Sequence, residues 1–438
     1  MSHNSLPFWK DYPERDNEWV RQYPTRHHAL SEADVFTTQP MGFYMHIPFC
    51  NRLCFSCPYI KHQTDKSVTQ RYVEALKREM SLYAARPYVQ DHRLEVGYIG
   101  GGTPTALSSE QLTEVLRHLR SEFSTLPGME ITVESTPLDI SEHKARTLLA
   151  EGVNRISLGV QTFVEQELVD IGRPADVAMI TEAIRMLHRI GVPRVNIDLM
   201  HGLNGQTMDS WHHSLQTAVD LGVSSISFYT YMEFAQVSTK RRKLPPVPPR
   251  EQVDEMFLYA AEFLTGQGYE GYFGDCFALP GQRPDYGART WTEEFPIIPL
   301  GPTATGHLKS HWYFNEPDIE RYMQQVNAGQ LPLSMGREIS AEERLRRAVV
   351  LGIKSSRLSR QRYLAQHGVD FAKLFADEIA TLQAQGLVRL TDEALEVTGP
   401  KGWYYMDNIS KAFYSPPHRR YPQHLGADIS PFMRIQAA

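Results

Sequence analysis

The sequence predicts an α/β protein in which a mostly parallel sheet closes, or partly closes, into a barrel, followed by a small α+β module. From residue 41 to about 250, short β-rich segments alternate with amphipathic helical segments, as right-handed βαβ units do. Glycine and polar residues follow several of the predicted strands, where such folds carry their chemistry. After about residue 335 the pattern changes to two helices and a β pair.

Six strands and the helices between them justify the barrel. The strands are expected at 42–47, 94–99, 131–133, 155–160, 194–199 and 224–229. Two helices begin at capping boxes, Ser67 with Gln70 and Ser108 with Gln111. Further helices are expected at 141–151, 177–190 and 209–221.

The chain divides into five predicted parts. They are an N-terminal arm (1–40), the barrel core (41–250), a barrel extension with a site-closing loop (251–335), a winged-helix-like domain (336–410) and a tail (411–438). In the fourth part, Ser340 with Glu343 begins a helix, a second helix includes Phe371 and Leu382, and a β pair follows.

Composition excludes several classes of protein. The chain has 438 residues, of which 42% are hydrophobic and 22% charged, with a net charge of −6. These values are ordinary for a globular protein and argue against a general nucleic-acid binder. No apolar run is long enough to span a membrane, and the polar N-terminus lacks the basic flank and apolar core of a signal peptide. We therefore expect a cytoplasmic protein.

Three of the four cysteines lie close together, which predicts a metal or cluster site. Cys50, Cys54 and Cys57 have the spacing CxxxCxxC, and Cys276 is distant. Three thiolates can hold three irons of a [4Fe–4S] cluster and leave the fourth iron open to a ligand. A zinc site is the alternative, and it would need His62 or Cys276 as the fourth ligand.

Further motifs occur in order along the chain. They are Tyr44-Met45-His46-Ile47-Pro48-Phe49-Cys50, Gly100-Gly101-Gly102-Thr103-Pro104, Ser157-Leu158-Gly159-Val160-Gln161 and Asn196-Ile197-Asp198-Leu199-Met200. With the cysteines they resemble the radical S-adenosylmethionine (radical SAM) enzymes, in the branch of oxygen-independent coproporphyrinogen III oxidase. The resemblance covers about residues 20–410 and implies a partial (β/α)6 TIM-like barrel with an oxidase-like C-terminal domain.

The resemblance also implies a site. The open iron would take the amino and carboxylate groups of SAM, and glycines in the loop would let the backbone approach this ligand. The residues expected to bind SAM are Tyr44, Gly101, Gly102, Thr103, Glu134, Gln161, Arg173, Asp198 and Met200. Met200 and the loop 301–307 would lie by a second SAM.

Departures from the oxidase pattern favour a different branch. Tyr59 stands where the oxidases have a further cysteine, Ser56 where they have an aromatic residue, and Cys276 where they have a histidine. The predicted function is therefore that of a class C radical SAM methyltransferase or cyclopropanase of natural-product biosynthesis. One SAM would yield a radical that activates the methyl group of a second SAM, whose methylene adds to an sp2 carbon of a small-molecule substrate. The candidates for the base are Tyr229, Tyr231, Glu233, Cys276 and His307.

Two alternatives stay open. One is a tetrapyrrole-pathway radical SAM enzyme related to coproporphyrinogen dehydrogenase, and the other is a haem chaperone. The resemblance implies an electron donor such as flavodoxin or ferredoxin in any enzymatic case.

Overall fold

The computed structural model describes residues 28–29, 42–54, 57, 62–90, 93–231, 244–292, 295–308 and 311–419. Glu233, Ser56 and Tyr59 lie outside these residues, as do almost all of the predicted N-terminal arm and the end of the predicted tail. Within the described residues no helix is both long and apolar enough to cross a membrane.

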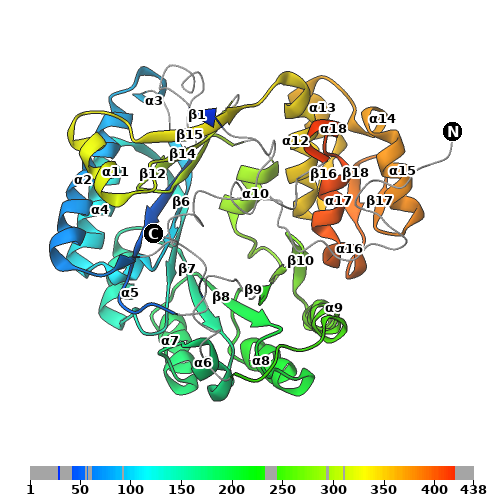
Figure 1. Ribbon diagram of the computed structural model, residues 1–438, viewed down its shortest axis with the longest axis horizontal. Coiled ribbons are helices and arrows are strands. Elements are labelled where there is room, and N and C mark those ends of the chain that lie inside the picture. Colours follow the sequence, from blue (N-terminus) through cyan, green and yellow to red (C-terminus); the bar gives the residue numbers. More distant parts are fainter. Residues whose placement is uncertain are drawn as a thin grey trace.

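A curved sheet of thirteen strands forms the larger part of the molecule, in the order β1-β15-β14-β13-β12-β2-β5-β6-β7-β8-β9-β11-β10 (Figure 1). Its centre is parallel and matches the six predicted strands. These are β2 (Gly42–Ile47), β5 (Arg93–Gly101), β6 (Ser124–Ser135), β7 (Arg155–Gln161), β8 (Arg194–His201) and β9 (Ser225–Thr230). In the described residues β1 and β10 are the two edges of the sheet, so the barrel is partial, as predicted.

Shorter strands extend the sheet on both sides. β12 (Ile297–Leu300) pairs in parallel with β2, and antiparallel strands continue from it. The flanking strands are β1 (His28–Ala29), β13 (Thr305–Leu308), β14 (His311–Asn315), β15 (Leu333–Glu338), β10 (Glu270–Tyr272) and β11 (Cys276–Ala278). A separate pair, β3 (Phe49–Cys50) and β4 (His62–Gln63), follows β2.

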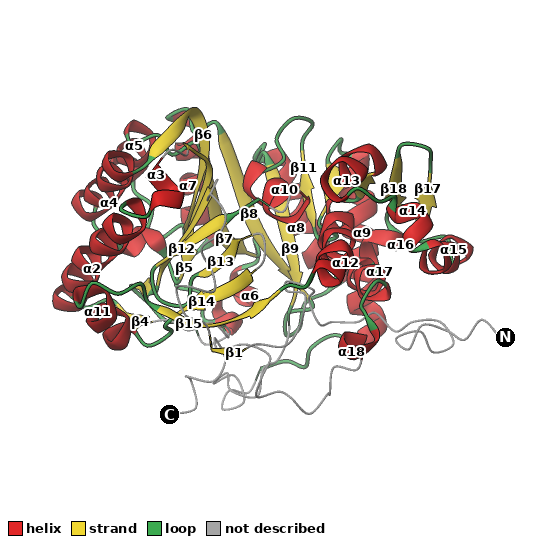
Figure 2. Cartoon of the chain, turned by 90° about the horizontal axis from the view of Figure 1, so that it is seen from above, coloured by secondary structure: helices red, strands yellow, loops and turns green. Residues whose placement is uncertain are grey.

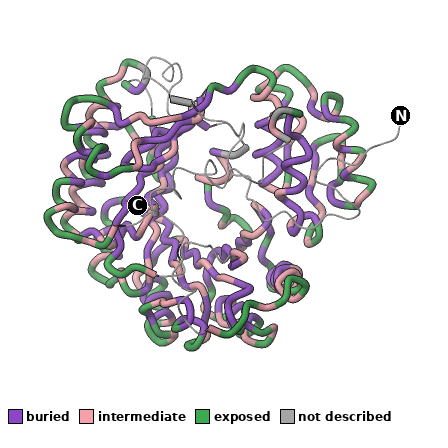
Figure 3. Tube along the Cα trace, in the orientation of Figure 1, coloured by how far each residue is buried: buried purple, intermediate pink, exposed green. Residues whose placement is uncertain are grey.

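Helices cover the convex side of the parallel strands (Figure 2). They are α2 (Lys66–Ala84), α3 (Pro87–Gln90), η1 (Pro104–Ala106), α4 (Ser109–Glu122), α5 (Glu142–Ala150), α6 (Glu165–Ile171), α7 (Val177–Arg189), α8 (Met208–Asp220), α9 (Arg250–Gly266) and α11 (Ile319–Asn327). Alternate strand residues such as Ile99, Val133 and Leu158 are almost fully buried and pack beneath these helices, and Figure 3 shows this buried layer. Burial of this apolar face holds the curved sheet to its helices.

The C-terminal domain packs helices around a small antiparallel sheet, ordered β16-β18-β17. Its elements are α12 (Ala341–Gly352), η3 (Ile353–Ser355), β16 (Arg357–Ser359), α13 (Arg360–His367), α14 (Phe371–Leu374), α15 (Ala376–Ala384), β17 (Val388–Leu390), β18 (Ala394–Val397), α16 (Lys401–Tyr404), α17 (Met406–Ala412) and α18 (Pro416–Arg419). The backbone N–H of Phe273 donates to the carbonyl of Lys354 at 2.7 Å and ties this domain to the β10–β11 turn. Between the two parts lies α10 (Asp285–Thr292) (Figure 1).

Local predictions succeed where the cap is unambiguous. Ser108 and Gln111 form the predicted capping box of α4, and Ser340 caps α12. The capping box at Ser67 is wrong: Asp65 caps α2, and its carboxylate accepts from the backbone N–H of Ser67. Aspartate is as good an N-cap residue as serine, and Asp65 lies just upstream, where its carboxylate accepts from the free N–H groups of the first turn.

Candidate active site on the inner face of the sheet

The two faces of the parallel sheet differ in chemistry. Because side chains alternate along a strand, the residues between the buried apolar ones point to the concave side, away from the helices. Many of these inward residues are polar, and those nearest the C-terminal ends of the strands are only partly buried. This inner row consists of Tyr44, Tyr98, Glu134, Gly159, Gln161, Asp198, Met200, Tyr229 and Cys276. Polar groups that are accessible to solvent therefore lie at the C-terminal ends of the parallel strands. The sequence predicts the site at these ends.

The cysteine loop begins at the C-terminal end of β2. Cys50 is buried, whereas Cys54 and Cys57 are partly exposed. Two predicted SAM-binding residues lie against these sulfurs. The hydroxyl of Thr103 lies 3.5 Å from Cys50 Sγ, and Nη1 of Arg173 lies 3.5 Å from Cys54 Sγ. The loop thus meets groups from β5 and from the end of α6.

The donor set fits a [4Fe–4S] cluster held by three cysteines. Three sulfur donors in one loop leave one iron corner without a protein ligand. A side chain at Gly102 would meet Cys50 Sγ at 3.0 Å and the Phe49 carbonyl at 2.7 Å, so only glycine lets these sulfurs and backbone groups approach one another. Among the described residues no three His, Cys, Asp or Glu side chains are arranged to hold a single metal ion.

The glycine loop after β5 is held in place by Glu134. Gly101 has φ +124°, a backbone conformation that favours glycine, and a Cβ there would lie 2.6 Å from the Ile47 carbonyl. Its N–H donates to Glu134 Oε2 at 3.0 Å, and the Tyr98 hydroxyl donates to Glu134 Oε1 at 2.7 Å. The Glu134 carboxylate, at the end of β6, therefore lies beside the loop next to Cys50.

Gln161 and Arg173 both lie beside Gly159 of the next strand, β7. Gln161 ends β7 with φ +79°, which is uncommon for a residue with a side chain. Arg173 follows Gly172, whose left-handed conformation ends α6, and its Nη2 donates to the Gly159 carbonyl. A Cβ at Gly159 would lie 2.5 Å from this nitrogen, so the glycine gives the guanidinium its place.

Asp198 continues the row on β8, directly beside Gly159 in the sheet register. Its Oδ1 accepts from Asn196 Nδ2 at 3.0 Å. Burial and the nearby Glu134 carboxylate raise the pKa of Asp198 to about 7. A carboxyl group so tuned can accept or donate a hydrogen bond near neutral pH.

The candidates for the base do not form one group. Tyr229 lies at the partly exposed end of β9, whereas Tyr231 is buried against Ile171, Leu203 and Met200. Cys276 belongs to the inner row, with Sγ 3.5 Å from the Ser227 hydroxyl, and burial followed by the charge of Asp275 raises the pKa of its thiol.

His307 lies far from the cysteine loop along the strands. It pairs with Ile297, which pairs in turn with Gly42 at the start of β2, so it sits at the opposite end of the sheet from Cys50. The turn at Gly301, predicted to close the site, lies beside His46 near the C-terminal end of β2: a Cβ at Gly301 would meet the His46 carbonyl at 2.5 Å.

Sequence reasoning missed several inward residues. The sequence indicates Tyr98 only through its position on a predicted strand, two residues before Gly100. This spacing puts the two residues on the same face of the strand. Tyr286, on α10, has its ring 5.1 Å from that of Tyr98. The Tyr44 hydroxyl lies 3.2 Å from His46 Nδ1, and burial lowers the pKa of His46 to about 4. Local sequence holds no signal for the Tyr286 contact.

Comparison with known proteins identifies the class. The Radical SAM superfamily profile matches residues 44–218, and the HemN C-terminal domain profile matches residues 339–405. The chain is therefore a radical SAM protein. Its two domains and its relatives place it in the HemN-like branch of that superfamily.

The relatives cover nearly the whole chain. Oxygen-independent coproporphyrinogen III oxidase from Escherichia coli is 28% identical over 93% of this chain and 90% of its own length. Heme chaperone HemW from Bacillus subtilis is 29% identical over 81% of this chain and 94% of its own length. The solved structure of coproporphyrinogen III oxidase (HemN) from Escherichia coli superposes with a TM-score of 0.76, at 28% identity, over 86% of this chain and 90% of that one.

These relatives overturn the predicted function. A methyltransferase or cyclopropanase reading is wrong, because the relatives that match along the chain are coproporphyrinogen oxidases and haem chaperones. The reading gave too much weight to Tyr59, Ser56 and Cys276. Three single residues say less about the reaction than a match over 93% of the chain that includes both domains.

Proposed function

We propose that this protein is a radical SAM enzyme that oxidises a tetrapyrrole, with oxidative decarboxylation of a coproporphyrinogen-type propionate as its reaction. The full-length match to oxygen-independent coproporphyrinogen III oxidase, over 93% of this chain, carries the proposal. The inner row supports it, because a large tetrapyrrole with several carboxylates needs a long polar surface and the row extends from β2 to β11.

Cys50, Cys54 and Cys57 would hold a [4Fe–4S] cluster, which supplies the electron that cleaves bound SAM. Arg173, 3.5 Å from Cys54 Sγ, places a positive charge beside sulfurs that would carry negative charge. The Thr103 hydroxyl, 3.5 Å from Cys50 Sγ, adds a hydrogen-bond donor. Hydrogen bonds to cluster sulfurs make reduction easier, so these residues help to set the potential.

Glu134 and the glycine loop would hold the methionine end of SAM. Glu134 already accepts from Gly101 N–H and the Tyr98 hydroxyl, which fixes its orientation before any ligand binds. A fixed carboxylate is suited to an ammonium group, and the exposed backbone at Gly101 and Gly102 allows close approach.

Gln161, Arg173 and Asp198 would hold the rest of SAM. Gln161 and Asp198 lie on the adjacent strands β7 and β8, Arg173 follows α6, and all three are partly exposed. Asp198, with its pKa near 7, can pair with a ribose hydroxyl in either protonation state. Tyr44, Met200 and Tyr229 remain candidates for contact with SAM or substrate at the same edge.

The test is anaerobic reconstitution with iron and sulfide, followed by reduction in the presence of SAM and coproporphyrinogen III. We expect substrate-dependent 5′-deoxyadenosine, which takes one hydrogen atom from a propionate, together with carbon dioxide and a product in which each converted propionate has become a vinyl group. The substrate radical passes one electron to an acceptor that the assay supplies, so each conversion removes CO2 and two hydrogens in all. Cys54→Ala is the matched control and should give none of them. No S-adenosylhomocysteine is expected.

The HemW relatives make a haem chaperone the second candidate, since HemW of Bacillus subtilis matches over 81% of this chain. A chaperone would bind added haem stoichiometrically, show a Soret band, and consume no SAM in response to coproporphyrinogen. That combination would contradict the enzymatic proposal.

A further inference from the structure

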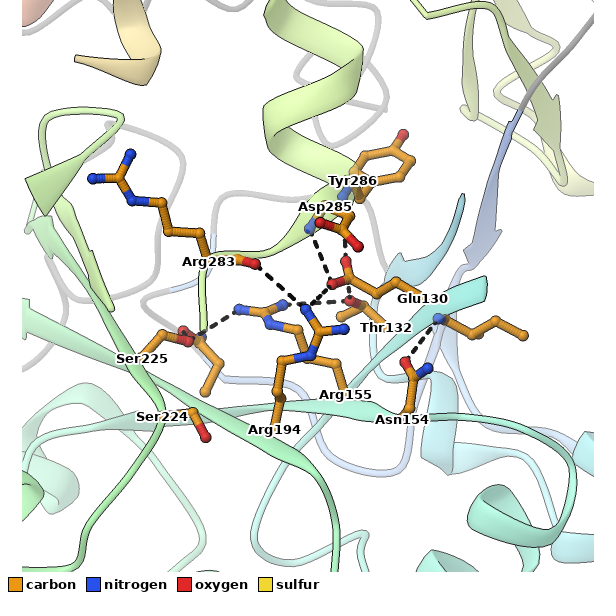
Figure 4. A network of polar contacts seen from close by, with 12 residues as sticks. Glu130, Thr132, Asn154, Arg155, Arg194, Ser224, Ser225, Arg283, Asp285 and Tyr286 are labelled. Atoms are coloured by element: carbon orange, nitrogen blue, oxygen red, sulfur yellow. Dashed lines mark hydrogen bonds and ion pairs between the residues drawn. The ribbon is translucent and has the colours of Figure 1, made fainter. Parts of the chain in front are cut away.

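A buried arginine lies on the inner face of the sheet, below the inner row. Arg155 begins β7, is 4% exposed, and pairs in register with Thr132 of β6 and Arg194 of β8. It precedes Ser157 and Gly159 by two and four residues, so its side chain shares their inward face. Figure 4 shows its guanidinium among polar groups from β6, β8 and β9.

The contacts of this guanidinium are few and long. Nη1 donates to the Thr132 hydroxyl and Nη2 to the Ser225 hydroxyl, each at 3.4 Å. Nε is buried without a hydrogen-bond partner. In the part of the chain that the structure describes, no carboxylate forms an ion pair with Arg155, whereas the neighbouring Arg194 donates to Glu130 at 2.7 Å.

The carboxylates near Arg155 already accept hydrogen bonds from other groups. Glu130 accepts from Arg194 and from the backbone N–H groups of Asp285 and Tyr286 at 3.0 and 3.2 Å (Figure 4). Asp198 interacts with Arg155 electrostatically, but its Oδ1 accepts from Asn196. A buried cation that lacks a contacting anion is costly, so an unfilled donor of this kind marks a place for an anionic group from outside.

An anionic group of a ligand would approach Arg155 from the inner row. Contacts link Arg155 to this row. Ser225, which accepts from Arg155, donates to Asn196 Oδ1 at 2.7 Å, and Asn196 Nδ2 donates to the partly exposed Asp198 at 3.0 Å. A ligand that covers the row therefore comes within reach of the guanidinium, whose Nε and Nη form a planar fork suited to a carboxylate. We propose that Arg155 binds a carboxylate group of the substrate.

This inference rests on the proposed function and adds to it. A tetrapyrrole with propionate side chains offers a carboxylate on a flexible two-carbon arm, which can reach below the plane of the ring system. A propionate bound at Arg155 would run past Asp198, one of the residues proposed to hold SAM. The anchored side chain would then be the one that is presented for reaction, so Arg155 selects for acidic side chains.

The experiment measures binding, without turnover. Reconstituted wild type, Arg155→Met, Arg155→Lys and Ser225→Ala are titrated with coproporphyrin III, which fluoresces, and with its tetramethyl ester in the same detergent. Ser225→Ala is the matched control, since it removes one contact of Arg155 and keeps the charge. Iron content and thermal midpoint verify that each variant is folded.

We expect wild type to prefer the acid to the ester, and Arg155→Met to weaken acid binding by about tenfold to a hundredfold with no change for the ester. Arg155→Lys should lose less, and Ser225→Ala should stay within about threefold of wild type. Equal acid binding by wild type and folded Arg155→Met overturns the inference and leaves the proposed function standing. Wild type that binds neither porphyrin overturns both.

Discussion

The buried carboxylate of Glu130 is the acceptor that joins α10 to the sheet, and Glu130→Gln tests its contribution to stability. Its side chain is 0% exposed. It accepts from Arg194 at 2.7 Å and from the first two backbone N–H groups of α10 at 3.0 and 3.2 Å. Glutamine has almost the same shape, but it has no charge and only one oxygen. The Thr132 hydroxyl also lies 3.5 Å from Oε1, so at least one of four donors must then face an NH2 group.

The expected loss follows from these contacts. Leaving one buried donor without an acceptor costs about 1–3 kcal/mol. Breaking a buried ion pair costs about 3–5 kcal/mol, but Arg194 keeps a side chain that is 20% exposed and regains part of its hydration. We therefore expect Glu130→Gln to lower the free energy of unfolding by about 2–4 kcal/mol.

Urea unfolding followed by far-UV circular dichroism measures this loss, and hydrogen exchange at Asp285 and Tyr286 locates it. Glu320→Gln is the matched control, because the Glu320–Arg71 pair, 2.8 Å long, is about half exposed on both sides. Exposed pairs contribute little, so the control should change stability by less than about 1 kcal/mol. If the two variants unfold at the same urea concentration, our account of Glu130 is wrong.

Three further predictions concern the cysteines, the glycine loop and a second buried acid. Cys54→Ala should lose the brown absorbance and all SAM cleavage; cleavage that survives would contradict the cluster assignment. Tyr98→Phe removes one hydrogen bond to Glu134, and a charged acceptor makes such a bond worth about 1.5–3 kcal/mol, so the KM for SAM should rise about tenfold while kcat changes little. An unchanged KM would contradict the proposed contact between Glu134 and SAM. Burial raises the pKa of Glu79 to about 7, above its unfolded value, so the folded state holds the extra proton between about pH 4.5 and 7 and stability falls as pH rises through that window. Glu79→Gln should make this slope shallower in urea midpoints from pH 5 to 8, with the raised pKa of Asp198 supplying the remainder, and an unchanged slope would exclude Glu79 as a source.

The sequence was sufficient for the parallel sheet because each strand carries local signals. Segments such as 155–160 and 194–199 combine β-branched residues with neighbouring helical periodicity, and β7 and β8 form there. β12 gave no comparable signal, since Ile297–Leu300 is four residues long and includes a proline. It becomes a strand because β2 offers a parallel edge, a tertiary cause that local patterns do not contain.

The residues of the site also differ in whether local sequence is enough to predict their positions. Cys50, Gly101 and Gly102 follow from spacing and backbone geometry, both of which are written in short motifs. His307 does not, because its distance from the cysteine loop depends on how β13 folds back on β12. Contacts between segments far apart in the chain, such as Glu130 with the start of α10, leave no local trace.

A chain of contacts runs from Glu130 through α10 to the glycine loop. Glu130 holds the start of α10, and Tyr286 in its first turn places its ring 5.1 Å from that of Tyr98. Tyr98 donates to Glu134, which accepts from Gly101 N–H. Glu130 therefore fixes the helix whose aromatic side chain supports the proposed SAM carboxylate. Glu130→Gln and Tyr98→Phe should consequently raise the KM for SAM less together than the product of their separate effects, because both act through one carboxylate.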